Sequence, residues 1–162
     1  MIILVSDTSI LIDLDRGGLL EAAFSCGLTM VVPDLLYESE LEKENGQYLK
    51  TLGLGVINLN PNEVTMAQSV HSQRPALSLP DCFALSCASR PGHTLITGDK
   101  ALRSEAMNRL GTVRGLLWLL DQMEASGSVS KSQLFQGLTQ IKAHIRCRLP
   151  KDEVKSRLDT WS

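Results

Sequence analysis

The sequence predicts an α/β fold of three layers, in which a mostly parallel central sheet lies between two layers of helices, followed by further helices at the C-terminus. Two observations carry this prediction. Short apolar runs alternate with helical segments along the first 113 residues, which is the order typical of parallel sheets. Aromatic residues make up 4% of the chain and hydrophobic residues 43%, so the core must be mainly aliphatic, as in a parallel sheet covered by helices.

The elements before residue 60 follow from apolar runs and the residues that interrupt them. Ser9 is placed to cap a helix, Gly27 to end one, and Pro33 to begin one, because the missing N–H of proline costs nothing at a helix start. In order, the predicted elements are a strand over 1–6, helices over 9–14 and 19–26, a strand over 28–32, helices over 34–44 and 48–52, and a strand over 56–59.

Capping patterns define the elements after residue 60. Asn60 precedes Pro61 and Glu63, a good N-terminal capping pattern, and Ser78 stands in the same relation to Asp81. The predicted elements of this part are a helix beginning at residue 60, a helix over 78–89, a strand over 94–97 and a helix over 99–111.

The C-terminal part is helical. Helices are expected over 114–125, 130–147 and 151–158, with Pro150 between the last two. We therefore divide the chain into an α/β domain over 1–113 and a helical extension over 114–162 packed on it. The basic residues of this extension predict a solvated helical surface, or alternatively an RNA-binding arm; they are Lys142, Arg146, Arg148, Lys151, Lys155 and Arg157.

Composition excludes several classes of protein. The net charge of −2 provides no global positive field, so nucleic-acid binding must rely on a local patch or a metal. The four cysteines form no CxxC pair and the three histidines lie far apart, which argues against a zinc site. No apolar run reaches the ~18 residues of a membrane span. These features predict a cytoplasmic protein with reduced thiols and no membrane segment.

Four carboxylates occupy equivalent positions after strands or at helix starts. They are Asp7, Glu38, Asp81 and Asp99. In parallel α/β folds such positions face one crevice at the carboxyl ends of the strands. Carboxylates brought together repel one another, and a hard divalent cation such as Mg²⁺ or Mn²⁺ relieves that repulsion. The pattern therefore favours a metal-dependent phosphodiesterase.

Each acid also has a purely structural interpretation. Asp81 and Asp99 are suited to cap their helices, and Asp7 to cap the helix near Ser9. Glu40 competes with Glu38, because residues two apart lie about 200° apart around a helix and cannot both face a metal. We expect Glu38 at the site, since it shares a face with Leu35 and Leu41.

The sequence motifs around these acids resemble those of the PIN-domain family. They are Ile-Leu-Val-Ser-Asp7-Thr-Ser-Ile-Leu-Ile, Val-Val-Pro33-Asp-Leu-Leu-Tyr-Glu38, Leu-Ser-Leu-Pro-Asp81-Cys-Phe-Ala-Leu and Leu-Ile-Thr-Gly-Asp99-Lys-Ala-Leu-Arg. All four occur in the family's order over roughly residues 1–112, and the last is the most characteristic. The C-terminal helices also look like the tail of a bacterial PIN subgroup.

The resemblance implies a parallel sheet between helices and Mg²⁺- or Mn²⁺-dependent hydrolysis of phosphodiesters, most often in RNA and less often in DNA. It implies Asp7, Glu38, Asp81 and Asp99 as catalytic acids, with the three aspartates holding the metal. Many bacterial members are toxins of toxin–antitoxin pairs, so a cognate antitoxin and a homodimer are expected partners. The alternative is a catalytically inactive PIN-like module that binds protein or RNA.

Residues beside the acids are candidates for substrate binding. The hydroxyl groups of Thr8, Ser9 and Thr97 stand next to them, and as neighbours of turns they are also suited to plain capping. Lys100 follows Asp99, a position from which it either binds a phosphate or lies on a solvated helix face.

Overall fold

The computed structural model describes residues 2–162, so Met1 of the expected first strand lies outside the described residues. The strands are β1 (Ile3–Ser6), β2 (Thr29–Pro33), β3 (Gly55–Ile57) and β4 (His93–Ile96). The helices are α1 (Thr8–Arg16), α2 (Leu20–Ser25), α3 (Asp34–Leu36), the π-helix η1 (Tyr37–Leu41), α4 (Gly46–Leu52), α5 (Pro61–Gln73), α6 (Leu79–Ala88), α7 (Lys100–Leu110), α8 (Leu116–Ala125), α9 (Lys131–Ala143) and α10 (Lys151–Trp161).

The four strands form one parallel sheet in the order β3-β2-β1-β4. The register aligns Ser6 with Ile96 and Pro33 with Ile57, so the carboxyl ends of all four strands meet at one edge. The chain leaves β1 toward β2 on one side and returns to β4 on the other. This reversal of strand order beside β1 creates the crevice in which parallel α/β proteins bind their ligands.

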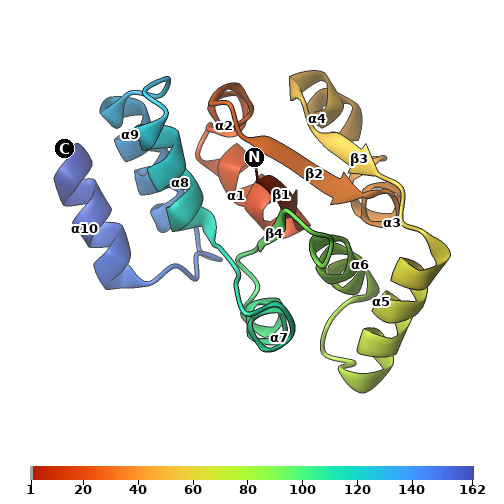
Figure 1. The fold of residues 1–162 in the computed structure, drawn as a ribbon. Helices are drawn as coiled ribbons and strands as arrows, with labels where there is room; N and C mark the ends of the chain where they lie inside the picture. Colours follow the sequence, from red (N-terminus) through yellow and green to blue (C-terminus); the bar gives the residue numbers. More distant parts are fainter. Residues whose placement is uncertain (1) are drawn as a thin grey trace.

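Helices cover both faces of the sheet, which confirms the predicted three-layer α/β architecture (Figure 1). Helix α6 packs on β1, β2 and β4 and carries α5 on its outer side. The core is mainly aliphatic, and Leu4, Val5 and Leu95 in the sheet are fully buried. Among the helices of residues 2–162, none combines the length and apolar character needed to cross a bilayer.

The C-terminal helices α8, α9 and α10 lie together at one side of the sheet (Figure 1). Helix α9 contacts α1 and packs so closely on the turn after it that a Cβ atom on Gly137 would stand 2.5 Å from Leu19 and 3.0 Å from the carbonyl oxygen of Gly17. The segment before α8 also extends the sheet, because Thr97 N–H donates to the Arg114 carbonyl and Arg114 N–H to that of Leu95. The C-terminal helices are thus attached to the α/β part at two places.

Two predicted helices differ from the observed ones. The helix expected over 34–44 is α-helical for three residues only and continues as the π-helix η1, in which Glu42 N–H donates to the Tyr37 carbonyl five residues back. Its buried side chains are Leu36, Tyr37 and Leu41. The helix expected over 130–147 ends at Ala143, and a turn follows it.

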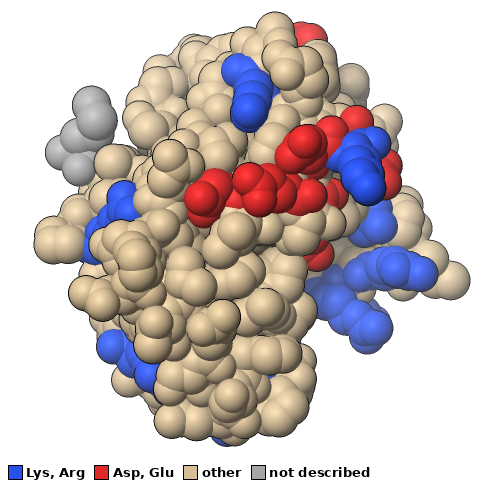
Figure 2. Space-filling view, turned by 90° about the vertical axis from the view of Figure 1, so that its right-hand side faces the viewer, with Lys and Arg blue, Asp and Glu red and all other residues tan. Residues whose placement is uncertain are grey.

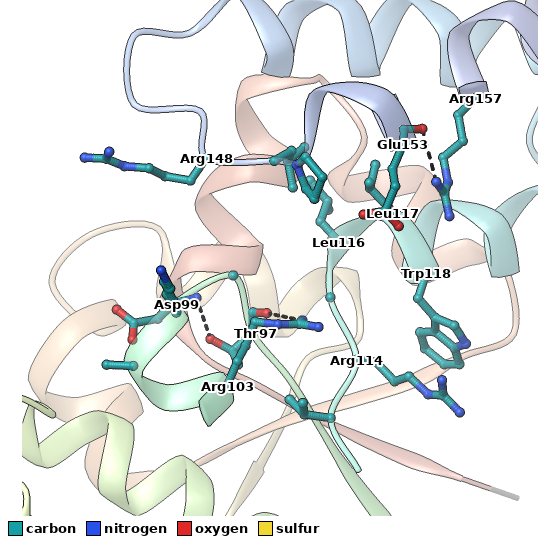
Figure 3. Close-up of a pocket in the computed structure, with 17 residues that line it drawn as sticks. Thr97, Asp99, Arg103, Arg114, Leu116, Leu117, Trp118, Arg148, Glu153 and Arg157 are labelled. Carbon is teal, nitrogen blue, oxygen red and sulfur yellow. Dashed lines mark hydrogen bonds between the residues drawn. The ribbon is translucent and has the colours of Figure 1, made fainter. Parts of the chain in front are cut away.

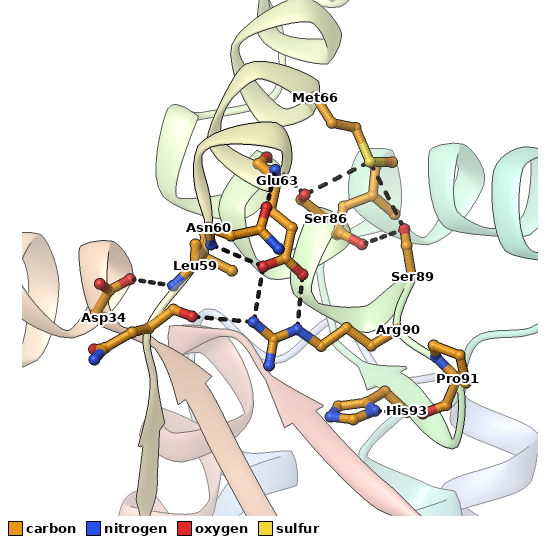
Figure 4. A network of polar contacts seen from close by, with 12 residues as sticks. Asp34, Leu59, Asn60, Glu63, Met66, Ser86, Ser89, Arg90, Pro91 and His93 are labelled. Carbon is orange, nitrogen blue, oxygen red and sulfur yellow. Dashed lines mark hydrogen bonds and ion pairs between the residues drawn. The ribbon is translucent and has the colours of Figure 1, made fainter.

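A polar network fastens α5 to α6 and to the turn before β4 (Figure 4). Asn60 and Glu63 form the expected reciprocal capping box at the start of α5. Arg90 donates two hydrogen bonds of 2.7 Å to the Glu63 carboxylate and a third of 3.0 Å to the Asn58 carbonyl. The hydrogen bonds from Arg90 make the largest contribution to the lowered pKa of Glu63. The Ser86 hydroxyl donates to the Glu63 carbonyl at 2.7 Å.

Replacing Arg90 tests how much this network stabilises the fold. Arg90→Ala removes three charge-assisted hydrogen bonds from a partly buried guanidinium, so we expect the free energy of unfolding to fall by about 1 to 3 kcal/mol in urea denaturation. Arg90→Lys retains the charge but not the paired geometry and should recover only part of the loss. Lys155→Ala is the control, because Lys155 pairs only with the exposed Asp159. Equal stability of Arg90→Ala and the control would contradict the prediction.

Candidate active site

Asp7 lies at the carboxyl end of β1, is 1% exposed and caps α1. Its Oδ1 accepts hydrogen bonds from the Ser9 hydroxyl at 2.7 Å and from Ile10 N–H at 3.3 Å, and its Oδ2 accepts one from the Thr97 hydroxyl. The expectation that Ser9 caps this helix was wrong, because the cap is Asp7 and Ser9 donates to it. The position one residue past the strand brings the carboxylate within reach of both the helix start and β4.

Ser9 and Thr97 connect Asp7 to the loop that carries Asp99. Gly98 N–H donates to the Ser9 hydroxyl at 3.1 Å, and Asp99 N–H donates to the Thr97 hydroxyl at 3.0 Å. Asp99 itself caps α7 by accepting from Leu102 N–H at 2.8 Å. Ser9 and Thr97, which the sequence suggested for substrate contact, therefore donate to Asp7 and accept from the backbone of the Asp99 loop.

Asp81 completes this group from the start of α6. Its backbone N–H donates to Ser78, the N-cap residue, at 3.2 Å, as the capping pattern predicted. Beside the effect of burial, the charges of Asp99 and Glu40 raise the pKa of Asp81, and the charge of Asp81 raises that of Asp7. Asp7 after β1, Asp81 in the first turn of α6 and Asp99 after β4 therefore lie at the same edge of the sheet, although their chain positions span more than ninety residues.

The acid that joins the aspartates from η1 is Glu40. Thr8 donates a 2.7 Å hydrogen bond to the Glu40 carboxylate from the first turn of α1, and Glu40 is among the charges that act on Asp81. Glu38 lines a separate hollow with Asp34, Lys50 and Asn58. The sequence predicts that Glu38 shares a face with Leu35 and Leu41. Leu36, Tyr37 and Leu41 are the side chains buried here, whereas Glu38 and Glu40 are both exposed, so burial does not select Glu38 for the site.

Burial and crowding make the site electrostatically unfavourable for ionised carboxylates. Burial raises the pKa of Asp7 to about 6, even though hydrogen bonds from Thr97, Ser9 and Ile10 act in the opposite direction. Burial also raises the pKa of Asp81 to about 6, opposed by hydrogen bonds from Ser78 and reinforced by the charges of Asp99 and Glu40. A positive ion near these oxygens would reverse both shifts.

The residues present fit a hard divalent cation by their chemistry. Carboxylate and hydroxyl oxygens line the site, and these are the ligands that Mg²⁺ and Mn²⁺ prefer. Within residues 2–162, however, no three His, Cys, Asp or Glu side chains lie close enough together to hold a metal ion. A cation at this edge of the sheet would therefore need waters and phosphate oxygens as further ligands.

The surface around the site is divided by charge. Figure 2 shows a band of acidic side chains on the side of the molecule that carries η1 and α4. Four exposed glutamates belong to this part of the chain: Glu38, Glu40, Glu42 and Glu44. A cavity of about 870 Å³ opens on the other side of Asp99, between the end of β4, the starts of α7 and α8, and the segment leading into α10 (Figure 3). Lys100 lines this cavity.

The raised pKa of Asp7 predicts how stability depends on pH. Because the folded-state pKa lies above its usual value of 3.8, the favourable contribution of protonated Asp7 is complete below about pH 4 and is lost as the pH rises through about 6. In metal-free protein, Asp7→Asn should therefore gain up to about 3 kcal/mol relative to wild type between pH 4 and pH 7. Urea denaturation at several pH values measures this difference, and a difference independent of pH would refute it.

The sequence was also compared with known proteins. The family model DUF3368, described as a PIN domain, matches residues 3–162, which include both the sheet and the C-terminal helices. No curated protein matches the sequence. PIN domains are generally nucleases, and PIN-domain nucleases generally use divalent metal ions. The match covers nearly the whole chain, and the acids at the strand ends agree with it: this protein belongs to the PIN-domain family.

Proposed function

We propose that this protein is a divalent-metal-dependent nuclease that hydrolyses phosphodiester bonds in single-stranded RNA. The observation that carries the proposal is the grouping of Asp7, Asp81, Asp99 and Glu40 at the carboxyl edge of the sheet, with the pKa values of two of them raised to about 6. Crowding carboxylates around the buried Asp7 costs stability, and a hard cation is the partner that offsets this cost. The family membership supports the same activity.

Each residue has a distinct part in the proposed site. Asp7, Asp81 and Asp99 would hold Mg²⁺ or Mn²⁺, and Glu40 would take the role that the sequence gave to Glu38. When bound, the cation supplies positive charge that offsets the charge of the phosphodiester and activates water for hydrolysis. Ser9 and Thr97 fix the orientation of Asp7, and Thr97 also fixes the loop of Asp99. Thr8 orients Glu40.

The expected partners follow from the family resemblance. Binding of a cognate antitoxin and formation of a homodimer remain predictions from that resemblance. A cytoplasmic location remains a prediction from composition. The division into a nuclease domain over 1–113 and an extension over 114–162 is likewise a proposal. The contact of α9 with α1 supports an extension that is packed on the α/β part.

Cleavage assays on paired glutamate and aspartate variants test the proposal. With Mn²⁺ and a fluorescent single-stranded RNA, Asp7→Asn and Asp99→Asn should lower the cleavage rate by about 100-fold or more. Glu40→Gln should lower it by at least about 10-fold, whereas Glu38→Gln, two residues away on the same π-helix, should stay within about twofold of wild type.

Circular dichroism spectra and thermal melts of the four variants serve as controls for folding. Absence of cleavage by the wild type with either metal would overturn the proposed activity. Loss of activity in Glu38→Gln but not in Glu40→Gln would leave the activity standing and reverse the assignment of the glutamate.

A further inference from the structure

The cavity beside Asp99 joins parts of the chain that are far apart in sequence. It is lined by Thr97 and Asp99 after β4, by Trp118 in the first turn of α8, and by Arg148 before α10. In Figure 3, Asp99 and Arg148 lie toward one end of the cavity and Arg114 and Trp118 toward the other. Because Asp99 lines the cavity and Thr97 donates to Asp7, the cavity adjoins the acid site. Its volume of about 870 Å³ is within the range of pockets that bind small ligands.

The lining of this cavity is basic in a chain whose net charge is −2. Five basic side chains line it, against the two acids Asp99 and Glu153. Arg157 is already engaged by Asp121 in a two-pronged ion pair, and Arg103 donates to the Thr97 carbonyl. Within residues 2–162, the remaining three form no ion pair; they are Lys100, Arg114 and Arg148. Unpaired cations beside a cavity are suited to phosphate groups.

One aromatic side chain stands among these cations. Trp118 is half-buried, and the guanidinium of Arg114 lies 5.4 Å from the centroid of its ring. Aromatic rings and guanidinium planes are the surfaces on which unpaired nucleic-acid bases stack. Bases inside a duplex are already stacked on one another, so only a single strand offers a base to such a surface.

We propose that this cavity binds the nucleotides next to the scissile phosphate of a single-stranded RNA, with phosphates held by Lys100 and Arg148 and a base stacked at Trp118 and Arg114. This inference rests on the proposed nuclease function and adds a substrate-binding site built by the C-terminal helices. One wall of the cavity is fixed by the sheet, and the other belongs to helices anchored by the close contact of Gly137 with Leu19. Its shape is therefore set before the substrate arrives, which lowers the entropic cost of binding.

Equilibrium binding in the Asp7→Asn background tests the proposal without cleavage. The probe is a fluorescein-labelled hexauridylate RNA in EDTA, read by anisotropy and by quenching of tryptophan fluorescence. Arg148→Ala and Trp118→Leu should each weaken binding by about 5- to 100-fold, and Trp118→Leu should abolish most of the quenching. Arg148→Ala should also lower the slope of log affinity against log salt by about one. Lys131→Ala, an exposed lysine outside the cavity, should have no more than a twofold effect.

Two further probes separate nucleic acid from other anionic ligands. An abasic hexanucleotide should bind more weakly than hexauridylate and cause no quenching, because it has no base to stack. A poly-glutamate peptide should bind more weakly still. Equal binding of the peptide and the RNA, or equal affinities of Arg148→Ala, Trp118→Leu and the lysine control, would overturn the proposal. Binding at the cavity without any cleavage by wild type would overturn the nuclease function alone and leave the RNA site in place.

Discussion

The buried carboxylate of Asp7 is the interaction on which the rest of the site depends. A charged group with 1% exposure is tolerated only when hydrogen-bond donors surround it. The donors here come from α1 and from the end of β4, so satisfying Asp7 also fixes the angle at which α1 leaves β1 and the distance between two strand ends. Asp99 then takes its position from the same hydroxyl that donates to Asp7. The hydrogen bonds that fix the backbone at this edge of the sheet are therefore the same ones that position Asp7 and Asp99.

The same arrangement is electrostatically unfavourable for ionised Asp7 and Asp81. Hydrogen bonds from Thr97, Ser9 and Ile10 do not fully compensate the burial of Asp7, whose pKa stays raised, and Asp81 is raised by burial and by its acidic neighbours. A fold selected only for stability would place amides or apolar groups at these positions. Retained repulsion of this kind is characteristic of sites that become stable on binding a cation or a substrate.

The sequence was most informative where a local rule decides the structure. Alternation of apolar runs with helical segments was sufficient for the three-layer architecture, and the Asn60 and Ser78 caps begin their helices as expected. The strand-end positions of Asp7 and Asp99 also followed from sequence, because parallel strands end at one edge. The sequence did not separate Glu38 from Glu40, because the Thr8 hydrogen bond to Glu40 comes from another element of the fold. The cavity was not foreseen either, because the meeting of Asp99, Trp118 and Arg148 depends on how α9 packs on α1.

Segregation of charge explains how a chain of net charge −2 can handle a polyanion. The exposed glutamates of η1 and the loop after it would repel phosphates, while the unpaired cations of the cavity beside Asp99 would attract them. A strand that approaches this edge is therefore favoured on the side of the C-terminal helices and disfavoured on the side of η1. Two of those cations, Arg114 and Arg148, come from residues after 113, so the α/β part alone would present Asp99 with a weaker positive partner. Under the proposed function, the segments beside the C-terminal helices would form part of the substrate site, and the family match extends through residue 162.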